Sequence, residues 1–320
     1  MKTINIDSEL NIKVIEEFKE ILNTDFIFIP IKNINNVKVN LKDNVLKGQL
    51  VYEDNFTKKY SSVSGKVFKI LDINNKIFLV IKNDYKEETI NKRARNLDNI
   101  DKSKFLEYYK NDKVKEILKN KINTLYVNAI DDDPYNYNKY MYLKNNLKDI
   151  EGIIKCLCDN FNIEKIKLVI KSNYGKLTKN YTSSINYHKV PNIYPIGNEI
   201  LLKKQIIKKD NDYLIDLYDL IDMIYDVKKN KIQTEKYITI GGNNIDMLCV
   251  LNVKKYSYLN NLLGNFKFID KKFEVILNNS LCGSKVNAKD IVISSLVDCV
   301  IINKVMEEEV CDCSKCGLCL

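Results

Sequence analysis

Two apolar strands flank one long amphipathic helix in the middle of the chain, and this alternation limits the possible folds more than any other feature. Segments 123–130 (NTLYVNAI) and 164–172 (EKIKLVIKS) carry the apolar and β-branched residues typical of buried strands. Between them, residues 139–161 place apolar side chains three and four apart, which forms one stripe along a helix: Leu143, Leu147, Ile150, Ile154, Leu157 and Phe161. A strand, a crossover helix and a second strand predict a parallel βαβ unit.

The flanking segments predict further β structure and shorter helices. Residues 26–85 alternate apolar and polar side chains around Lys-Asp-Asn and Lys-Gly turns, which favours a compact β unit. Three later runs, KYITIGG, KFEVILNNS and DIVISSLVDCVIIN, are also typical of strands. Helices are expected over 1–25, within the charged segment 86–121, and over 213–228. A chain of 320 residues with these patterns is expected to fold as several α/β and β domains.

The charge and hydropathy of the chain exclude some classes of protein. The net charge is +9, from 51 basic and 42 acidic side chains, but lysines are interleaved with acidic residues along the whole chain. A nucleic-acid-binding protein usually concentrates its basic residues on one face or arm, so no nucleic-acid partner is expected. No signal peptide is evident, and no apolar run approaches the roughly 18 residues of a membrane span. We expect a cytoplasmic protein that does not insert into a membrane. Peripheral attachment to a membrane through a protein complex stays open.

Nine cysteines fall into two groups. Five stand singly in apolar stretches and are expected to be small buried side chains: Cys156, Cys158, Cys249, Cys282 and Cys299. The other four lie within the last ten residues, CDCSKCGLCL. A cytosolic protein keeps its thiols reduced, so the four clustered cysteines are candidate metal ligands rather than disulfides.

The cysteine tail has the spacing of an iron–sulfur ligand set. Cys313, Cys316 and Cys319 form C-x2-C-x2-C, and Gly317 permits a tight turn beneath the sulfurs. The bacterial ferredoxin run continues with x3-C-P, whereas this chain ends at Leu320. Cys311 is a candidate fourth ligand, although one residue separates it from Cys313. A 4Fe–4S cluster, a four-cysteine zinc site and a tail without metal all remain open.

Several segments occur in the order found in one known family. IPIKNI, VNLKDNVLKGQLV and SSVSGKV are followed by LYVNAIDDDPYNYNKYMYLKN, then VPNIYPIGNEILL, YITIGG and VILNNSLCG, and the cysteine tail comes last. On these segments, over residues 26–320, the chain resembles the RnfC-like family, whose type member belongs to the Rnf electron-transport complex. That family includes the proline-reductase-associated electron-transfer protein and the cobalamin reductase of propanediol metabolism. It is more distantly related to the flavin-carrying, NADH-binding subunit of respiratory complex I.

The resemblance implies a domain order. It places a barrel-sandwich hybrid domain at 26–88, a Rossmann-like α/β domain at 100–232 that is similar to the core of the complex I flavin subunit, and an SLBB-like β-grasp domain at 233–305. An N-terminal helical segment, 1–25, precedes these domains. A truncated ferredoxin-like, cysteine-rich tail, 306–320, follows them.

The resemblance also implies site residues. The family's cofactor-binding positions correspond to Asn128, Asp131, Asp133, Tyr194 and Glu199, and the cluster ligands would be Cys311, Cys313, Cys316 and Cys319. Three possibilities stay open for the iron–sulfur cluster: this chain supplies all its ligands, the ligand set is incomplete, or a partner protein supplies part of it. From the residues alone, Asp131, Asp132 and Asp133 are more simply a solvated acidic turn before Pro134, and their place after a strand keeps a ligand site open.

The chain departs from the family at the flavin and NADH loop. That loop needs glycines so that backbone amides can approach phosphate, but no glycine occurs between Gly65 and Gly152. This absence argues against binding of FMN and of NADH. Asn198 replaces a glycine of the Tyr-Pro-x-Gly-Gly-Glu segment. Asn278 and Asn279 replace paired glycines in a later turn, which can survive because asparagine tolerates left-handed backbone angles.

Two functions follow as hypotheses. The first is an RnfC-like electron-transfer protein without its own NADH-oxidising site, which passes electrons through the tail cluster to or from a flavoprotein, a ferredoxin or a membrane electron-transport complex. The alternative is a non-catalytic scaffold or assembly subunit of a redox complex. His188, the one histidine, and Lys47, in a hairpin of the type that carries lipoyl groups, are more simply structural residues.

Overall fold

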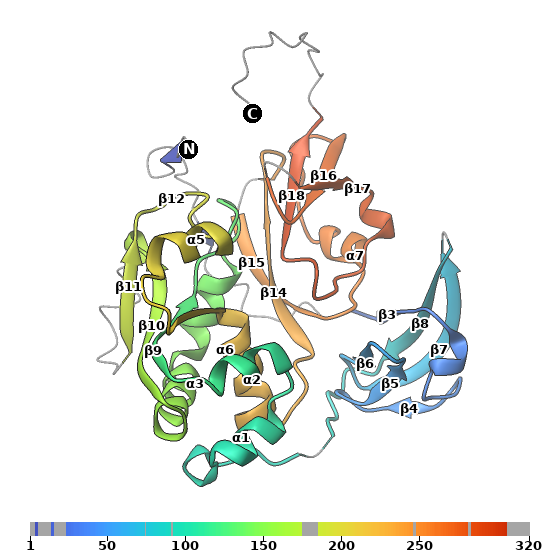
Figure 1. Cartoon of the computed structure of the whole chain (residues 1–320). Coiled ribbons are helices and arrows are strands. Elements are labelled where there is room, and N and C mark those ends of the chain that lie inside the picture. The colour runs from blue at the N-terminus through green and yellow to red at the C-terminus, as the bar shows by residue number, and fades with distance from the viewer. Residues whose placement is uncertain are drawn as a thin grey trace.

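The computed structural model describes residues 4–5, 14–15, 24–73, 75–90, 92–174, 185–245, 248–280 and 283–305. Within these residues the chain is a mixed α/β protein that contains several separate sheets. Figure 1 shows three main bodies in chain order: a strand-rich N-terminal body, a parallel sheet covered by helices, and a second strand-rich body.

The N-terminal body consists of two sheets of short strands. Its four-stranded sheet has the order β3-β8-β7-β4 with antiparallel pairing, and a separate hairpin pairs β5 with β6. In β3 every second residue is buried, although all six of its residues are apolar. The strands are β3 (Phe26–Ile31), β4 (Asn44–Val45), β5 (Leu50–Glu53), β6 (Lys58–Tyr60), β7 (Gly65–Ile73) and β8 (Lys76–Asn83).

The central body is built on a parallel sheet. Its strand order is β11-β10-β9-β13, and every neighbouring pair is parallel. The crossover helix α3 (Asn138–Asn160) joins β9 to β10, so the predicted βαβ unit is confirmed. The strands are β9 (Ile122–Asn128), β10 (Ile163–Lys171), β11 (Asn186–Val190) and β13 (Asp212–Asp216).

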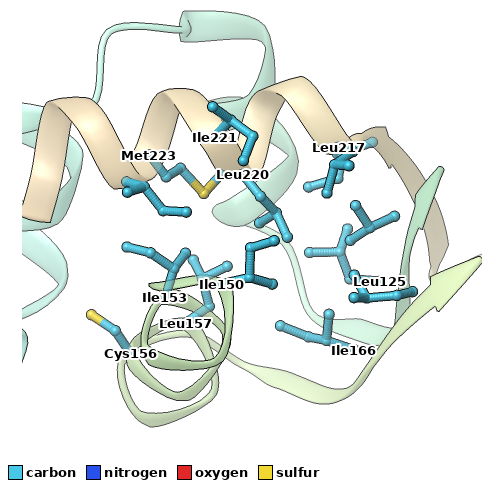
Figure 2. Close-up of a cluster of buried hydrophobic side chains, with 14 of the residues drawn as sticks. Leu125, Ile150, Ile153, Cys156, Leu157, Ile166, Leu217, Leu220, Ile221 and Met223 are labelled. Atoms are coloured by element: carbon cyan, nitrogen blue, oxygen red, sulfur yellow. The ribbon is translucent and has the colours of Figure 1, made fainter. Parts of the chain in front are cut away.

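Helices cover both faces of the parallel sheet. Leu125 and Ile166 on one face pack in a single core with α3 and with α6 (Leu217–Met223), as Figure 2 shows. Helices α1 (Lys102–Tyr108) and α2 (Asp112–Leu118) add buried side chains to the same core. On the other face, α5 (Glu199–Ile206) packs against Tyr126 and Val169 in a smaller core. Along β9 and β10, apolar side chains enter both cores: Leu125 and Ile166 lie in the larger core, and Tyr126 and Val169 lie in the smaller one.

The helix predicted over 213–228 is partly wrong. Residues 212–216 form β13, which pairs with β9, and the helix begins only at Leu217. The carboxylate of Asp216 accepts a hydrogen bond from the backbone N–H of Tyr218, and Asp219 reaches back to the N–H of Asp216. This capping box sets the boundary between strand and helix. After Met223 the chain continues as one π-helical segment, Ile224–Lys229.

The C-terminal body contains a mixed sheet. The order β17-β16-β18-β14-β15 places β14 and β18 side by side in parallel, whereas the other pairs in this run are antiparallel. A short helix, α7 (Leu259–Leu263), follows β15. The strands are β14 (Glu235–Gly241), β15 (Leu248–Lys254), β16 (Phe273–Leu277), β17 (Ser284–Val286) and β18 (Cys299–Lys304).

Near the N-terminus the structure differs from the predicted helical segment. Val14–Ile15 form β2, which pairs in parallel with Leu248–Cys249 of β15. Ile4–Asn5 form β1, which pairs with β12 (Ile193–Tyr194). β2 forms one edge of the sheet that contains β15, and β1 forms a two-stranded sheet with β12. At these four residues strand pairing takes the place of the predicted helix, and the other residues of 1–23 lie outside the described part of the chain.

The isolated cysteines and the asparagine turn can be checked directly. Cys156, Cys249 and Cys299 are buried as expected, but Cys158 is exposed because it falls on the solvent side of α3; Cys282 lies outside the described residues. Asn278 has a φ of 71°, so the left-handed turn predicted for this position is confirmed.

Candidate functional site

The carboxyl edge of the parallel sheet collects most of the predicted cofactor residues. Asn128 is the last residue of β9, and Asp131 and Asp133 follow it in the connection to α3. Asp216 ends the neighbouring strand β13. In open parallel sheets this edge is the usual place for a ligand, so the question is whether these side chains face a free space.

Asn128 is used to hold two loops together. Its Nδ2 donates to the carbonyl of Gly197 at 3.0 Å, and its Oδ1 accepts from the N–H of Ile130 at 3.1 Å. A Cβ at position 197 would lie 2.6 Å from the carbonyl oxygen of Asp131, so only glycine lets the two backbones approach this closely. The loop before α5 therefore closes directly onto the loop after β9.

Asp131 caps the crossover helix from a fully buried position. Both of its carboxylate oxygens accept from the backbone N–H of Lys139, at 3.0 and 3.2 Å. Burial raises the pKa of Asp131 to about 7, and the charge of Lys139 opposes this shift. The side chain is 3% exposed.

Asp133 links the central body to the C-terminal body. One of its oxygens accepts from the N–H of Tyr135 at 2.7 Å. The other accepts from the N–H and the hydroxyl of Ser280, at 2.6 and 2.7 Å. All the hydrogen bonds described for this carboxylate are therefore internal, and it is 1% exposed.

Lys139 is the charged residue of this edge that sequence reasoning missed. Its Nζ lies 2.6 Å from Asp216 Oδ2 and 3.2 Å from the carbonyl oxygen of Ile130. Burial alone would lower the pKa of Lys139, but the carboxylates of Asp216 and Asp131 raise it above its ordinary value. The available signal was a lysine in the helical segment NKYMYL, six residues after the last of three consecutive aspartates.

A polar network seals the edge against the C-terminal body. Thr239 of β14 donates to Asn138 Oδ1 at 2.9 Å and accepts from the N–H of Tyr137 at 3.0 Å. Asn138 donates in turn to the carbonyl of Asp298 at 2.7 Å. These contacts lie between the start of α3 and the strands β14 and β18, so the C-terminal body covers the edge.

Tyr194 and Glu199 lie apart from this buried network. Tyr194 is half-buried in β12, opposite Ile4. Glu199 lies in the first turn of α5, 58% exposed, with its carboxylate 2.7 Å from the amine of Lys203. The structure therefore brings together Asn128, Asp131 and Asp133 and leaves the other two predicted residues outside the group.

The glycine-free segment that precedes β9 contains two short helices. Residues 102–118 form α1 and α2, whose apolar side chains enter the central core. Asn111, which precedes α2, donates to Asp219 at 3.0 Å. These short helices occupy the segment with packed side chains instead of open backbone amides.

The three predicted cofactor residues that lie together at the sheet edge do not fit FMN. Asn128, Asp131 and Asp133 are each at most 3% exposed and have protein partners, so none offers a free donor or acceptor to a flavin. Four cavities in the described part of the chain have none of these three residues in their walls. The arrangement is a structural polar core between two bodies.

Lys47 is also held by the protein. Its amine lies 2.6 Å from Glu87 Oε2 and 2.5 Å from Glu235 Oε1, and the amine of Lys254 contacts the same two oxygens at 2.7 and 2.9 Å. Burial alone would lower the pKa of Lys47, but the hydrogen bonds to Glu235 and Glu87 raise it. A lysine engaged in this four-residue ion-pair cluster is not presented for attachment of a lipoyl or biotinyl group.

The four predicted cluster ligands, Cys311, Cys313, Cys316 and Cys319, lie outside the described residues. Among the residues that are described, no three His, Cys, Asp or Glu side chains are grouped closely enough to hold a metal ion. No helix in that same part of the chain is long and apolar enough to cross a membrane.

Comparisons with known proteins give only remote similarity. No protein-family model matches the chain, and no curated protein matches it. Two solved structures that resemble it are chains of an NAD+-reducing [NiFe]-hydrogenase, in the H2-reduced and air-oxidised states, with 8% and 9% identity and TM-scores of 0.43 and 0.46. Each match covers 59% of this chain and 42% of the hydrogenase chain. Similarity at this level does not show that this chain shares the fold or the activity of the hydrogenase.

Proposed function

We propose that this chain is an RnfC-like electron-transfer component that carries electrons on an iron–sulfur cluster in its cysteine tail. The observation that carries the proposal is the C-x2-C-x2-C spacing of Cys313, Cys316 and Cys319. Cys311 or a partner protein would supply the fourth thiolate. Electrons would pass one at a time to or from a flavoprotein, a ferredoxin or a membrane electron-transport complex.

The carboxyl edge of the parallel sheet is occupied by buried, hydrogen-bonded side chains, which supports a role that does not include hydride transfer. Hydride transfer from NADH to a flavin needs an open site in which the nicotinamide lies against the flavin. In this chain Asn128, Asp131 and Asp133 are buried and engaged with other protein groups. An electron-transfer role would therefore rest on the tail alone.

The strand arrangement supports the proposed domain order. In the C-terminal body, β15-β14-β18-β16 has two parallel central strands and two antiparallel outer ones, with α7 between the second and third strands in sequence. This order is the one we propose as an SLBB-like β-grasp domain at 233–305. The sheets of β3 to β8 support a barrel-sandwich domain at 26–88 in the same way.

The tail cluster can be tested with cysteine variants of the full chain, purified anaerobically and reduced with dithionite. The wild-type protein is expected to give the electron paramagnetic resonance signal of a reduced 4Fe–4S cluster. Cys316→Ser should abolish or alter that signal, and Cys158→Ser should leave it unchanged because Cys158 is a single exposed thiol on α3. A wild-type chain without any such signal, or a signal unaffected by Cys316→Ser, would contradict the proposal.

A scaffold or assembly subunit is the second candidate. The filled edge favours it, because buried polar contacts such as Asp133 with Ser280 fix the bodies to one another without leaving a cofactor site. A scaffold would hold redox subunits together with no cluster of its own. Removal of residues 306–320 would then leave assembly with the partner intact, whereas the electron-transfer role requires that the truncated chain lose electron transfer.

A further inference from the structure

A groove between the N-terminal and C-terminal bodies has no role in the proposed function. It has a volume of about 480 Å³, within the range of roughly 300–1,000 Å³ typical of small-molecule sites. The hairpin β5–β6 forms one side, and the segments around β14, β15 and residues 294–296 form the other. We call it the lysine groove; it is lined by Pro30, Thr57, Lys58, Lys59, Tyr60, Ser62, Ile232, Gln233, Thr234, Lys255, Tyr256, Ser294, Ser295 and Leu296.

The charged residues that line the lysine groove are all positive. Three of its lining residues are lysines, and none is an aspartate or glutamate. Lys58 is the outermost, 60% exposed, and pairs with Glu53 at 2.8 Å. Lys59 is half-buried and donates to the carbonyl of Pro30 at 2.5 Å, a neutral partner.

Lys255 has the least compensated charge. Its amine donates to the amide oxygen of Gln233 at 3.4 Å, and no described carboxylate lies within ion-pair distance of it. Burial lowers the pKa of Lys255 to about 8, and the more distant Asp222 opposes this shift. A largely buried ammonium group without an adjacent anion is costly, so an anionic ligand would be bound favourably there.

The walls of the groove are fixed by buried polar contacts. The hydroxyl of Ser62 donates to the carbonyl of Lys255 at 2.5 Å. On the opposite wall the buried amine of Lys236 donates to the carbonyls of Ser294 and Ser295, at 3.3 and 3.1 Å, and to Asp298 at 2.8 Å. Lys236 thus anchors the 294–296 segment from behind. Because Lys58 pairs with Glu53, Lys255 and Lys59 are the groove lysines that form no ion pair with a described carboxylate.

We propose that the lysine groove binds a small organic anion of about mononucleotide size, with its phosphate or carboxylate group on Lys255 and with Lys59 as a second cation of the same groove. Charge-assisted hydrogen bonds from the two amines would supply the strongest contacts. Tyr60, Tyr256, Ile232 and Leu296 provide ring and aliphatic surface for the rest of the molecule. This site is independent of the cysteine tail.

Calorimetric titration of the full chain tests the proposal with three probes: AMP, citrate and the neutral adenosine. AMP, citrate or both should bind, and adenosine should bind more weakly than AMP. Binding of AMP alone would identify phosphate, and binding of citrate alone would identify carboxylate. Failure of both anions to bind at millimolar concentration would overturn the proposal.

Matched lysine variants locate the site. Lys255→Met keeps the aliphatic stem and removes the charge, and it should weaken binding of the anion by about tenfold or more. Lys272→Met, at an exposed position outside the groove, should bind like wild type. Lys59→Met serves as the second groove variant if Lys255→Met does not fold. Wild-type affinity in every folded groove variant would contradict the assignment.

Discussion

At the scale of single residues, polar side chains that were predicted to bind a cofactor have structural roles instead. Asn128 ties the loop of Gly197 to the loop after β9, and Asp131 caps α3. Both roles need a buried side chain with fixed partners, which is the opposite of what a cofactor site requires. Two substitutions at this edge test the structural role.

Asp131→Asn should change how stability depends on pH. The pKa of Asp131 is raised to about 7 in the folded protein, so the native state holds this proton more tightly than the unfolded chain does. Unfolding then releases the proton between about pH 4 and pH 7, and the contribution of Asp131 to the free energy of unfolding falls as the pH rises. Urea unfolding at several pH values should show a smaller fall in stability for the variant than for wild type. Parallel curves for the two proteins would show that Asp131 titrates normally.

Gly197→Ala should destabilise the protein by about 1–3 kcal/mol, because the new Cβ would press on the backbone of Asp131 at 2.6 Å. Gly264→Ala is the control, since the nearest atom to its Cβ would be 3.4 Å away. Thermal unfolding of both variants measures the difference. Equal stability of the two would mean that the loops around positions 131 and 197 can separate at little cost.

At the scale of elements, the central body follows the patterns of the sequence closely. The stripe on α3 predicts a buried face, and Leu143, Leu147, Ile150 and Leu157 are indeed buried. Ile150 lies between α3 and α6 in the core that Figure 2 shows.

Ile150→Ala should therefore lower the free energy of unfolding by about 2–5 kcal/mol, as expected for a cavity in a packed core. Ile154→Ala removes the same atoms from a partly buried position on the same helix and should cost less. Chemical denaturation of both variants checks this order. The reverse order would show that the stripe does not face the core in solution.

The same elements show where sequence patterns stop being informative. Leu214 continues the three-four spacing of the following helix, but it lies in β13, because pairing with β9 and the cap at Asp216 decide the boundary. Lys139 carries a charge in an apolar helix, and its partner Asp216 is 77 residues away. The spacing of apolar residues predicts which face of a helix is buried. Strand pairing and the ion pair of Lys139 with Asp216 depend on contacts between residues far apart in the sequence, which that spacing does not indicate.

At the scale of the whole molecule, buried polar contacts join the three bodies. The ion-pair cluster of Lys47, Glu87, Glu235 and Lys254 connects the β4–β5 turn and the segment after β8 to β14 and β15. Lys254 is only 1% exposed, and its amine pairs with both carboxylates of the cluster. No sequence pattern indicates this cluster, because Lys47 and Glu235 alone are 188 residues apart.

Glu235→Gln should destabilise the protein by about 3 kcal/mol, because it leaves two lysines to share Glu87 in a mostly buried site. Glu199→Gln makes the same change in an exposed pair and should cost less than about 1 kcal/mol. Unfolding of both variants in denaturant measures the contrast. A small effect at Glu235 would mean that water enters the cluster and compensates the lost charge.

The most direct test of the electron-transfer proposal is the cofactor content of the anaerobically purified full chain, with iron, acid-labile sulfide, zinc and flavin measured on one sample. The proposal predicts about four iron and four sulfide per chain, as one cubane cluster requires, without stoichiometric FMN. Stoichiometric FMN would contradict the structural role of Asn128, Asp131 and Asp133. A protein without iron and sulfide would contradict the electron-transfer role itself and favour the scaffold.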